Sequence, residues 1–223
     1  MPPRGLDPTG IILLDKPAGP SSFTLVSDTR RRTGAKTGHA GTLDPFATGL
    51  LVLLSGRATK LASRFVGLDK RYLTEIDLTS RTTTGDPEGE TIDVHEPPTA
   101  DELAPQLLEL TGEIELPIPT ASAVKIDGER AYKLHRRGVA VEMPLRRSTV
   151  YELTLVDFVG GIATLDLRVS SGTYVRAIAD ALGGHCSTLR RLAVGPFLVE
   201  EADPITVIPA ADALVRLATA VAP

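Results

Sequence analysis

The stretch Gly38–Leu51 brings together residues that could do chemistry on a shaped loop. It holds three glycines, one proline, His39 and Asp44 just ahead of an apolar run, Leu50–Leu54. Glycine permits tight turns and proline fixes φ, so we expect a loop that leads into a buried strand. A carboxylate held on such a loop is a candidate catalytic group. The alternative is that Asp44 only shapes a turn, as aspartate before proline often does.

Several common catalytic and cofactor-binding motifs are missing from the sequence. It has no Gly-x-x-x-x-Gly-Lys-Ser/Thr loop, no Gly-x-Gly-x-x-Gly fingerprint and no Gly-x-Ser-x-Gly elbow. The four histidines lie far apart and there is one cysteine, so we expect no metal site and no cofactor. The side chains that remain as candidates for catalysis are carboxylates, tyrosines and arginines. They suit a reaction in which a carboxylate meets positive charge developing on a sugar, with an arginine keeping that carboxylate ionised.

Charge is distributed unevenly along the chain. The net charge is −4, yet residues 82–124 contain no Lys or Arg, so all 24 basic residues lie outside this acidic segment. A protein with one acidic lobe can still present a basic face to a polyanion. The alternative, that the basic clusters are ordinary solvated faces, stays open on composition alone.

Apolar periodicity and turn residues predict an α+β fold with a mixed, mostly antiparallel central sheet flanked by helices and loops. Strands are expected at 10–15, 50–54, 72–78, 114–116, 122–126, 139–143, 148–158 and 162–169. Helices are expected at 23–32, 58–65, 99–112, 129–137, 173–182, 187–192 and 208–220. Thr99–Glu102 has the pattern of a capping box, and Val159–Gly161 that of a hairpin turn.

The cellular setting is expected to be the cytoplasm. Cys186 has no cysteine partner in the chain, which favours a reducing compartment. Residues 1–8 lack the apolar core of a signal peptide, and no apolar run approaches transmembrane length.

Six segments of the chain together point to one family. They are Gly10–Pro17, Gly38–Leu51, Gly67–Tyr72, Ser122–Gly128 with Ala131 and Tyr132, Ser170–Arg176, and Leu189–Arg191 with Val194–Phe197. In this order they resemble the tRNA pseudouridine synthase B family, whose members isomerise one uridine, at position 55, in the T-arm loop of tRNA. One segment would be weak evidence, but six in register span nearly the whole chain. The resemblance implies a pseudouridine-synthase fold.

The resemblance implies three catalytic residues. Asp44 matches the catalytic aspartate, which attacks the target nucleotide or stabilises its cleaved sugar. Tyr72 matches the tyrosine that stacks on the target base and helps to remove the proton from C5. Arg176 matches the arginine that pairs with the catalytic carboxylate. Without the resemblance, Tyr72 is a core strand residue and Arg176 a surface ion-pair partner.

Four further residues are implied in substrate binding. His39 matches the histidine that touches the flipped-out nucleotides, and Tyr174 matches a tyrosine lining the same pocket. Lys16 and Pro17 match a segment that supports the active-site loop. A base inside a folded loop must be flipped into a pocket before it can react, and water must be excluded while the uracil is detached. The product is an isomer of the substrate, which agrees with the expectation of no cofactor.

Two departures from the family pattern are visible. The run Leu116–Ala121 replaces a Gln, a Pro-Pro pair and a Tyr that family members often show. Many members also continue into a small RNA-binding domain of the PUA type, which we expect this chain to lack. We therefore expect one catalytic domain over 1–223, with the acidic segment 82–124 inserted and a helical tail over 205–223.

The expected partner is the T-arm stem-loop of tRNA, with no membrane association, no obligate protein partner and a monomeric state. Two alternatives stay open. The chain could be an RNA-binding or tRNA-folding module in which catalysis is secondary, or a pseudouridine synthase that acts on another RNA.

Overall fold

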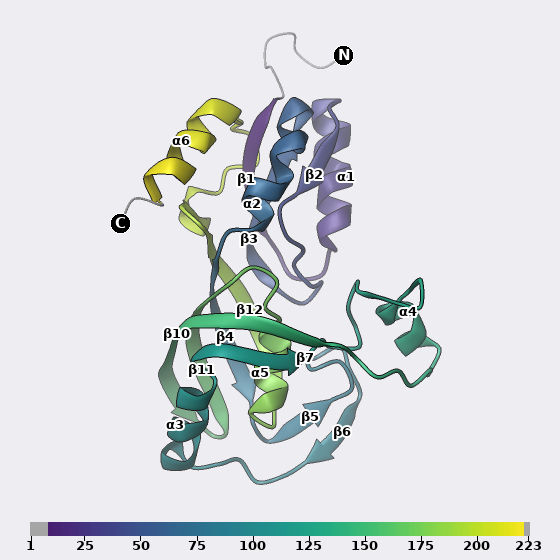
Figure 1. The fold of residues 1–223 in the computed structure, drawn as a ribbon, viewed down its shortest axis with the longest axis vertical. Coiled ribbons are helices and arrows are strands. Elements are labelled where there is room, and N and C mark those ends of the chain that lie inside the picture. The colour runs from purple at the N-terminus through teal and green to yellow at the C-terminus, as the bar shows by residue number, and fades with distance from the viewer. Residues whose placement is uncertain (1–8, 221–223) are drawn as a thin grey trace. The chain divides into compact units, whose positions relative to one another are not determined.

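The computed structural model describes residues 9–220 and divides into two compact units (Figure 1). Unit 1 contains the chain up to Tyr72 and again from Leu189, and unit 2 is Leu73–Thr188. The chain passes from one unit to the other inside two strands, β4 (Lys70–Asp77) and β12 (His185–Val194). The expectations about a signal peptide at residues 1–8 and about the last residues of the tail, 221–223, lie outside the described residues.

Unit 1 is built on a mixed sheet centred on β3 (Thr48–Ser55). Antiparallel neighbours are β1 (Gly10–Lys16) and β2 (Thr37–His39), and the end of β12 pairs with β3 in parallel. The remaining elements of unit 1 are α1 (Ser22–Thr33), η1 (Gly56–Leu61), α2 (Ala62–Val66), β13 (Phe197–Leu198), η2 (Val199–Glu201), β14 (Ile208–Pro209) and α6 (Ala210–Ala220).

Strand β3 is buried on both faces, which explains its continuous apolar sequence. Leu50, Val52 and Leu54 point into a cluster that includes Phe65 of α2 and Ala213 of α6. Leu51 and Leu53 point to the opposite face, where Val26 of α1 packs on them. The strand that follows the Asp44 loop is therefore anchored in the core of unit 1.

Unit 2 contains an antiparallel sheet of β7 (Gly112–Pro117), β10 (Leu145–Val159) and β11 (Ile162–Val169), continued by the second part of β4. Every second residue of β11 is buried, the pattern of a strand with one face in the core. The helices of unit 2 are α3 (Ala100–Glu109), α4 (Ala131–Arg136) and α5 (Val175–Ala181). Two hairpins pair separately: β5 (Ser80–Thr82) with β6 (Thr91–Val94), and β8 (Lys125–Ile126) with β9 (Glu129–Arg130).

The α+β class and mixed sheet predicted from the sequence are confirmed, as are several local signals. Thr99 and Glu102 form both hydrogen bonds of a capping box at the start of α3. Gly160 and Gly161, with φ of 60° and 83°, make the two-residue turn between β10 and β11. Positive φ at both turn positions matches the right-handed twist of the paired strands.

Three local predictions are wrong. The expected helix 187–192 is part of strand β12, because Arg190 and Arg191 pair with β3 while the Thr188 hydroxyl accepts the Glu75 N–H of β4. Long-range pairing overrides a short local helix preference. The expected strand 139–143 has no regular structure and is largely exposed. The expected strand 122–126 shrinks to Lys125–Ile126.

The acidic segment 82–124 supplies structural elements of unit 2. It contains β6, α3 and β7, and β7 pairs along β10 from Gly112 to Pro117. Within residues 9–220 no helix is long and apolar enough to cross a membrane. The same residues hold no cluster of three His, Cys, Asp or Glu side chains suited to a metal ion.

Candidate active site

The Asp44 loop joins β2 to β3 in unit 1, and three buried side chains hold its backbone. The Lys16 amine, at the end of β1, donates to the carbonyl oxygens of Pro45 at 2.9 Å and Ala47 at 2.6 Å. It also donates to the Pro17 carbonyl at 2.9 Å. The lysine therefore fixes the backbone directly after Asp44.

Ser22 fixes the residue directly before Asp44. Its hydroxyl donates to the Leu43 carbonyl and accepts the Leu43 N–H, both at 2.9 Å. Ser22 is the first residue of α1, and Ser21 caps this helix by accepting the Thr24 N–H. A reciprocal hydrogen bond of this kind links the loop rigidly to the start of the helix.

Arg191 is the third anchor. From the sequence it belongs to the family segment Leu189–Arg191, but no site role is assigned to it there. Its guanidinium is 1 % exposed and donates to Leu50 O at 2.7 Å, Gly41 O at 3.1 Å and Thr42 O at 3.4 Å. The strand alternation of β12 points its neighbour, Arg190, outward to Asp15. Apart from the family segment, the available signal was this alternation, which the expectation of a helix at 187–192 obscured.

Gly49 lets Arg191 reach the loop. It has φ of 99°, and a Cβ at this position would lie 2.3 Å from the backbone oxygen of Arg191. The parallel pairing of Arg191 with Gly49 therefore requires glycine for both conformation and space.

Two further titratable groups, His39 and Lys70, lie near Arg191. The His39 ring Nδ1 accepts the Gly41 N–H at 3.3 Å, and the pKa of His39 is lowered by burial and by the charge of Arg191. Lys70 donates to the carbonyls of Val66 and Leu68. Burial, followed by repulsion from Arg191, lowers the pKa of Lys70 to about 8. Both shifts follow from placing positive groups together away from water.

Arg176 is the second residue of α5 in unit 2, and its guanidinium is buried. It donates to Thr84 O at 2.7 Å and to Ala121 O at 3.0 Å, and it lies 3.3 Å from Asp86 Oδ2. Asp86 is buried too, and its other oxygen accepts the Thr84 hydroxyl at 2.6 Å. The sequence places Asp86 in the acidic segment 82–124 and in a turn, and it assigns Asp86 no role in the site.

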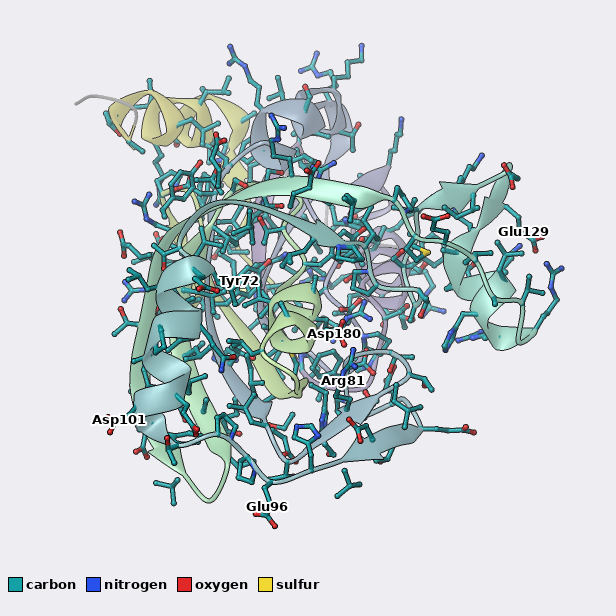
Figure 2. The ribbon with its side chains drawn as sticks, turned by 60° about the horizontal axis from the view of Figure 1, so that its bottom comes forward. Tyr72, Arg81, Glu96, Asp101, Glu129 and Asp180 are labelled. Carbon is teal, nitrogen blue, oxygen red and sulfur yellow. The ribbon has the colours of Figure 1, made fainter. Side chains whose placement is uncertain are left out.

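The turn between β5 and β6 shapes this Arg176 site. Gly85, with φ of 70°, lies against Arg176, where a Cβ would be 3.4 Å from the arginine Cβ. At the other end of α5, Asp180 accepts a hydrogen bond of 2.6 Å from Arg81 of β5 (Figure 2). The β5–β6 hairpin is therefore bonded to α5 at two points.

The predicted site residues fall into two groups. Lys16, Pro17, His39, Asp44 and Tyr72 belong to unit 1. Within that group, Lys16 contacts the Asp44 loop, and Tyr72 is a buried residue of β4.

The second group lies in unit 2 and contains Arg176 and Tyr174. Tyr174 is half-buried in the position before α5, and it lines a small cavity together with Arg146 and Thr173. One unit thus offers a carboxylate on a braced loop, and the other offers a guanidinium with a fixed orientation.

Comparison with known proteins decides the family. Residues 30–175 match the model of the TruB family pseudouridylate synthase N-terminal domain. The chain belongs to the TruB family of pseudouridylate synthases. It is 41% identical over 96% of its length to tRNA pseudouridine synthase B of Thermobifida fusca, and covers 78% of that protein. It is 42% identical to the enzyme of the same name from Mycobacterium sp. (strain KMS), and the match covers 88% of this chain and 70% of that protein.

Solved structures agree with the TruB assignment. A chain in the crystal structure of a Cbf5–Nop10–Gar1 complex superposes with a TM-score of 0.66 at 28% identity, over 86% of this chain and 50% of that chain. A crystal structure of a pseudouridylate synthase shares the fold with a TM-score of 0.52 at 17% identity, over 93% of this chain and 73% of that one. The protein is therefore an enzyme of the pseudouridine synthase class.

Proposed function

We propose that this TruB-family enzyme converts the uridine at position 55, in the T-arm loop of tRNA, to pseudouridine. The identity to tRNA pseudouridine synthase B of Thermobifida fusca over almost the whole chain is the main support. The proposed substrate is a tRNA bound without an obligate protein partner, and the proposed setting is the cytoplasm.

Asp44 is the proposed catalytic carboxylate. Its loop neighbours are held by Lys16, Ser22 and Arg191, so the carboxylate has little freedom to move away from a bound nucleotide. Holding a reacting group in position lowers the entropic part of the barrier. In the proposed reaction the bond between N1 and C1′ breaks, the uracil turns, and a bond between C5 and C1′ forms. C5 loses a proton and N1 gains one, so the composition is unchanged.

Arg176 and Tyr72 are the proposed partners of Asp44. The Arg176 guanidinium is aimed by Asp86 and by the carbonyls of Thr84 and Ala121, and in this proposal it keeps the carboxylate ionised. Tyr72 stacks on the flipped uracil and takes part in removing the C5 proton. Asp44 acts on the sugar or on the base, and both routes use the same three residues.

An assay with purified protein and an unmodified tRNA transcript tests the proposal. The purified protein alone, without a second protein, is expected to form pseudouridine at the T-arm uridine. No pseudouridine is expected in a ribosomal RNA transcript. Asp44→Asn should abolish product while RNA binding persists, and Asp101→Asn is the matched control, because Asp101 is an exposed residue of α3 in unit 2. Wild-type turnover by Asp44→Asn would refute the mechanism. Product only in the ribosomal transcript would refute the substrate.

A further inference from the structure

Phe23 is an aromatic side chain left in solvent beside the Asp44 loop. It is 73 % exposed, whereas the other four phenylalanines, all within the described residues, are buried or half-buried. Phe23 directly follows Ser22, whose hydroxyl is bonded to both backbone groups of Leu43. The exposed ring is therefore attached, through a rigid connection, to the backbone next to the proposed catalytic carboxylate.

Helical periodicity places an arginine on the same side of α1 as Phe23. Ser22, Val26 and Thr29 form the buried face of the helix. Phe23, Ser27 and Arg30 follow the same spacing one residue later, so they form a stripe on the outer side. A rise of about 1.5 Å per residue separates Phe23 from Arg30 by about 10 Å along the helix axis.

The positive charge of Arg30 is not neutralised by a carboxylate. Within residues 9–220, Arg30 has no ion-pair partner, whereas its neighbour Arg31 is paired with Asp28. Lys36 is likewise exposed and unpaired within the described part of the chain. The outer side of α1 therefore ends in positive charge that no carboxylate neutralises, about 10 Å along the helix axis from the aromatic ring.

We propose that the outer stripe of α1 binds the RNA substrate next to the target uridine. A base beside the flipped nucleotide stacks on Phe23, and a backbone phosphate further along the same strand binds Arg30. This inference rests on the proposed function, because it requires an RNA in the Asp44 site. Unstacked loop bases commonly stack on aromatic side chains, and phosphates bind arginine. The pairing of an exposed ring with free positive charge favours RNA over a protein partner.

The Phe23 contact is tested by binding a T-arm stem-loop RNA to full-length protein carrying Asp44→Asn, which separates binding from turnover. Phe23→Ala should weaken binding by about 5- to 100-fold, the range for one stacked base. Phe23→Tyr should retain affinity, and Phe23→Leu should lose it, because stacking needs a ring. Tyr151→Ala, at an exposed aromatic residue of unit 2, is the matched control and should bind like the parent.

A fluorescent purine analogue placed at each nucleotide beside the target identifies the stacked base. Its emission should be quenched on binding at one position and recover with Phe23→Ala. If the Ala, Leu and Tyr variants all bound RNA with the affinity of the parent, the Phe23 contact would be overturned. Losses of equal size in all three variants would overturn it too. The melting temperatures of the variants should match the parent, because the ring is exposed.

The Arg30 contact is tested by salt dependence. Arg30→Gln should reduce the slope of log affinity against log salt by about 1. Arg216→Gln, which removes the exposed ion pair with Glu201, is the control and should leave the slope unchanged. An unchanged slope for Arg30→Gln would overturn this contact.

These binding results are independent of the proposed reaction. If wild-type protein formed no pseudouridine but Phe23 and Arg30 variants lost RNA affinity as described, the result would support the RNA-binding stripe and refute the proposed function. If pseudouridine formed at the T-arm uridine while all α1 variants bound RNA like the parent, only the proposed RNA-binding stripe would be refuted.

Discussion

The two units bury an arginine each, and they treat its charge differently. Arg191 in unit 1 donates only to neutral carbonyls, and within residues 9–220 no carboxylate pairs with it. Arg176 in unit 2 has two carbonyl acceptors and the buried carboxylate of Asp86. The first arrangement fixes a backbone path, and the second fixes the direction of a charged group. The loop that carries the proposed catalytic carboxylate is thus braced without a competing carboxylate beside it.

Removing Arg176 should give the largest loss of stability. Arg176→Met leaves Asp86 buried without its cation, which should lower the free energy of unfolding by about 3–5 kcal/mol. Adding Asp86→Asn should restore part of the loss, because the orphaned charge is then gone. Urea unfolding measures both. Arg168→Met, at the exposed pair with Glu152, should cost less than about 1 kcal/mol. No recovery in the double variant would contradict the pairing of Asp86 with Arg176.

Removing Arg191 should cost less stability, since no carboxylate is stranded. Arg191→Met leaves carbonyl oxygens without donors, for a loss of about 1–3 kcal/mol. A loss larger than that of Arg176→Met would break the comparison between the units.

The catalytic effect of Arg191 should be seen with Arg191→Lys, which keeps the charge but cannot reach three carbonyls. The single-turnover rate should fall about 10- to 100-fold with little change in RNA affinity, because the Asp44 loop is misplaced. Arg190→Lys, at the exposed partner of Asp15, is the matched control. Equal rates for the two variants would mean that Arg191 does not position the loop.

The crowding of positive charge in unit 1 should appear in the pH dependence of stability. The pKa of Lys70 is about 8 in the folded protein and 10.5 as its ordinary value. Between these values the unfolded chain binds more protons, so stability should rise with pH from about 8 to 10.5, by about 1–2 kcal/mol. Lys70→Met should remove this rise in urea unfolding, and the exposed Lys36→Met should not. If the rise of stability with pH persisted in Lys70→Met, another titratable group would be its cause.

The smallest expected effect is on His39. Burial is the main cause of its lowered pKa and Arg191 the second, so Arg191→Met should raise the pKa of His39 but leave it below its ordinary value. An NMR titration of the imidazole measures this. A full return to the ordinary value would show that burial is not the dominant cause.

Local signals predicted part of the fold because their causes are local. The capping box at Thr99 and the glycine turn at Gly160 depend on backbone groups within a few residues. The apolar run Leu50–Leu54 had to be buried wherever the strand lay. The helix expected at 187–192 failed because its residues pair with β3 and β4, which are distant in the chain.

The candidate site was predicted unevenly for the same reason. Asp44 could be found because glycines and proline around it shape a loop, and the family resemblance supplied Tyr72 and Arg176. Arg191 lies in a family segment and Asp86 in the acidic segment, but neither context shows that the charge is buried, since their partners lie far away in the chain.

The amino-acid sequence by itself determined the Asp44 loop, the buried strand behind it and the order of the family segments, because turn geometry and hydrophobic burial are properties of neighbouring residues. Only the tertiary structure decided which charges are buried and what they hold. Arg191 reaches the loop because β12 pairs with β3, and Asp86 lies beside Arg176 because the turn between β5 and β6 packs on α5. The chain separates these segments widely, and no local pattern records such contacts.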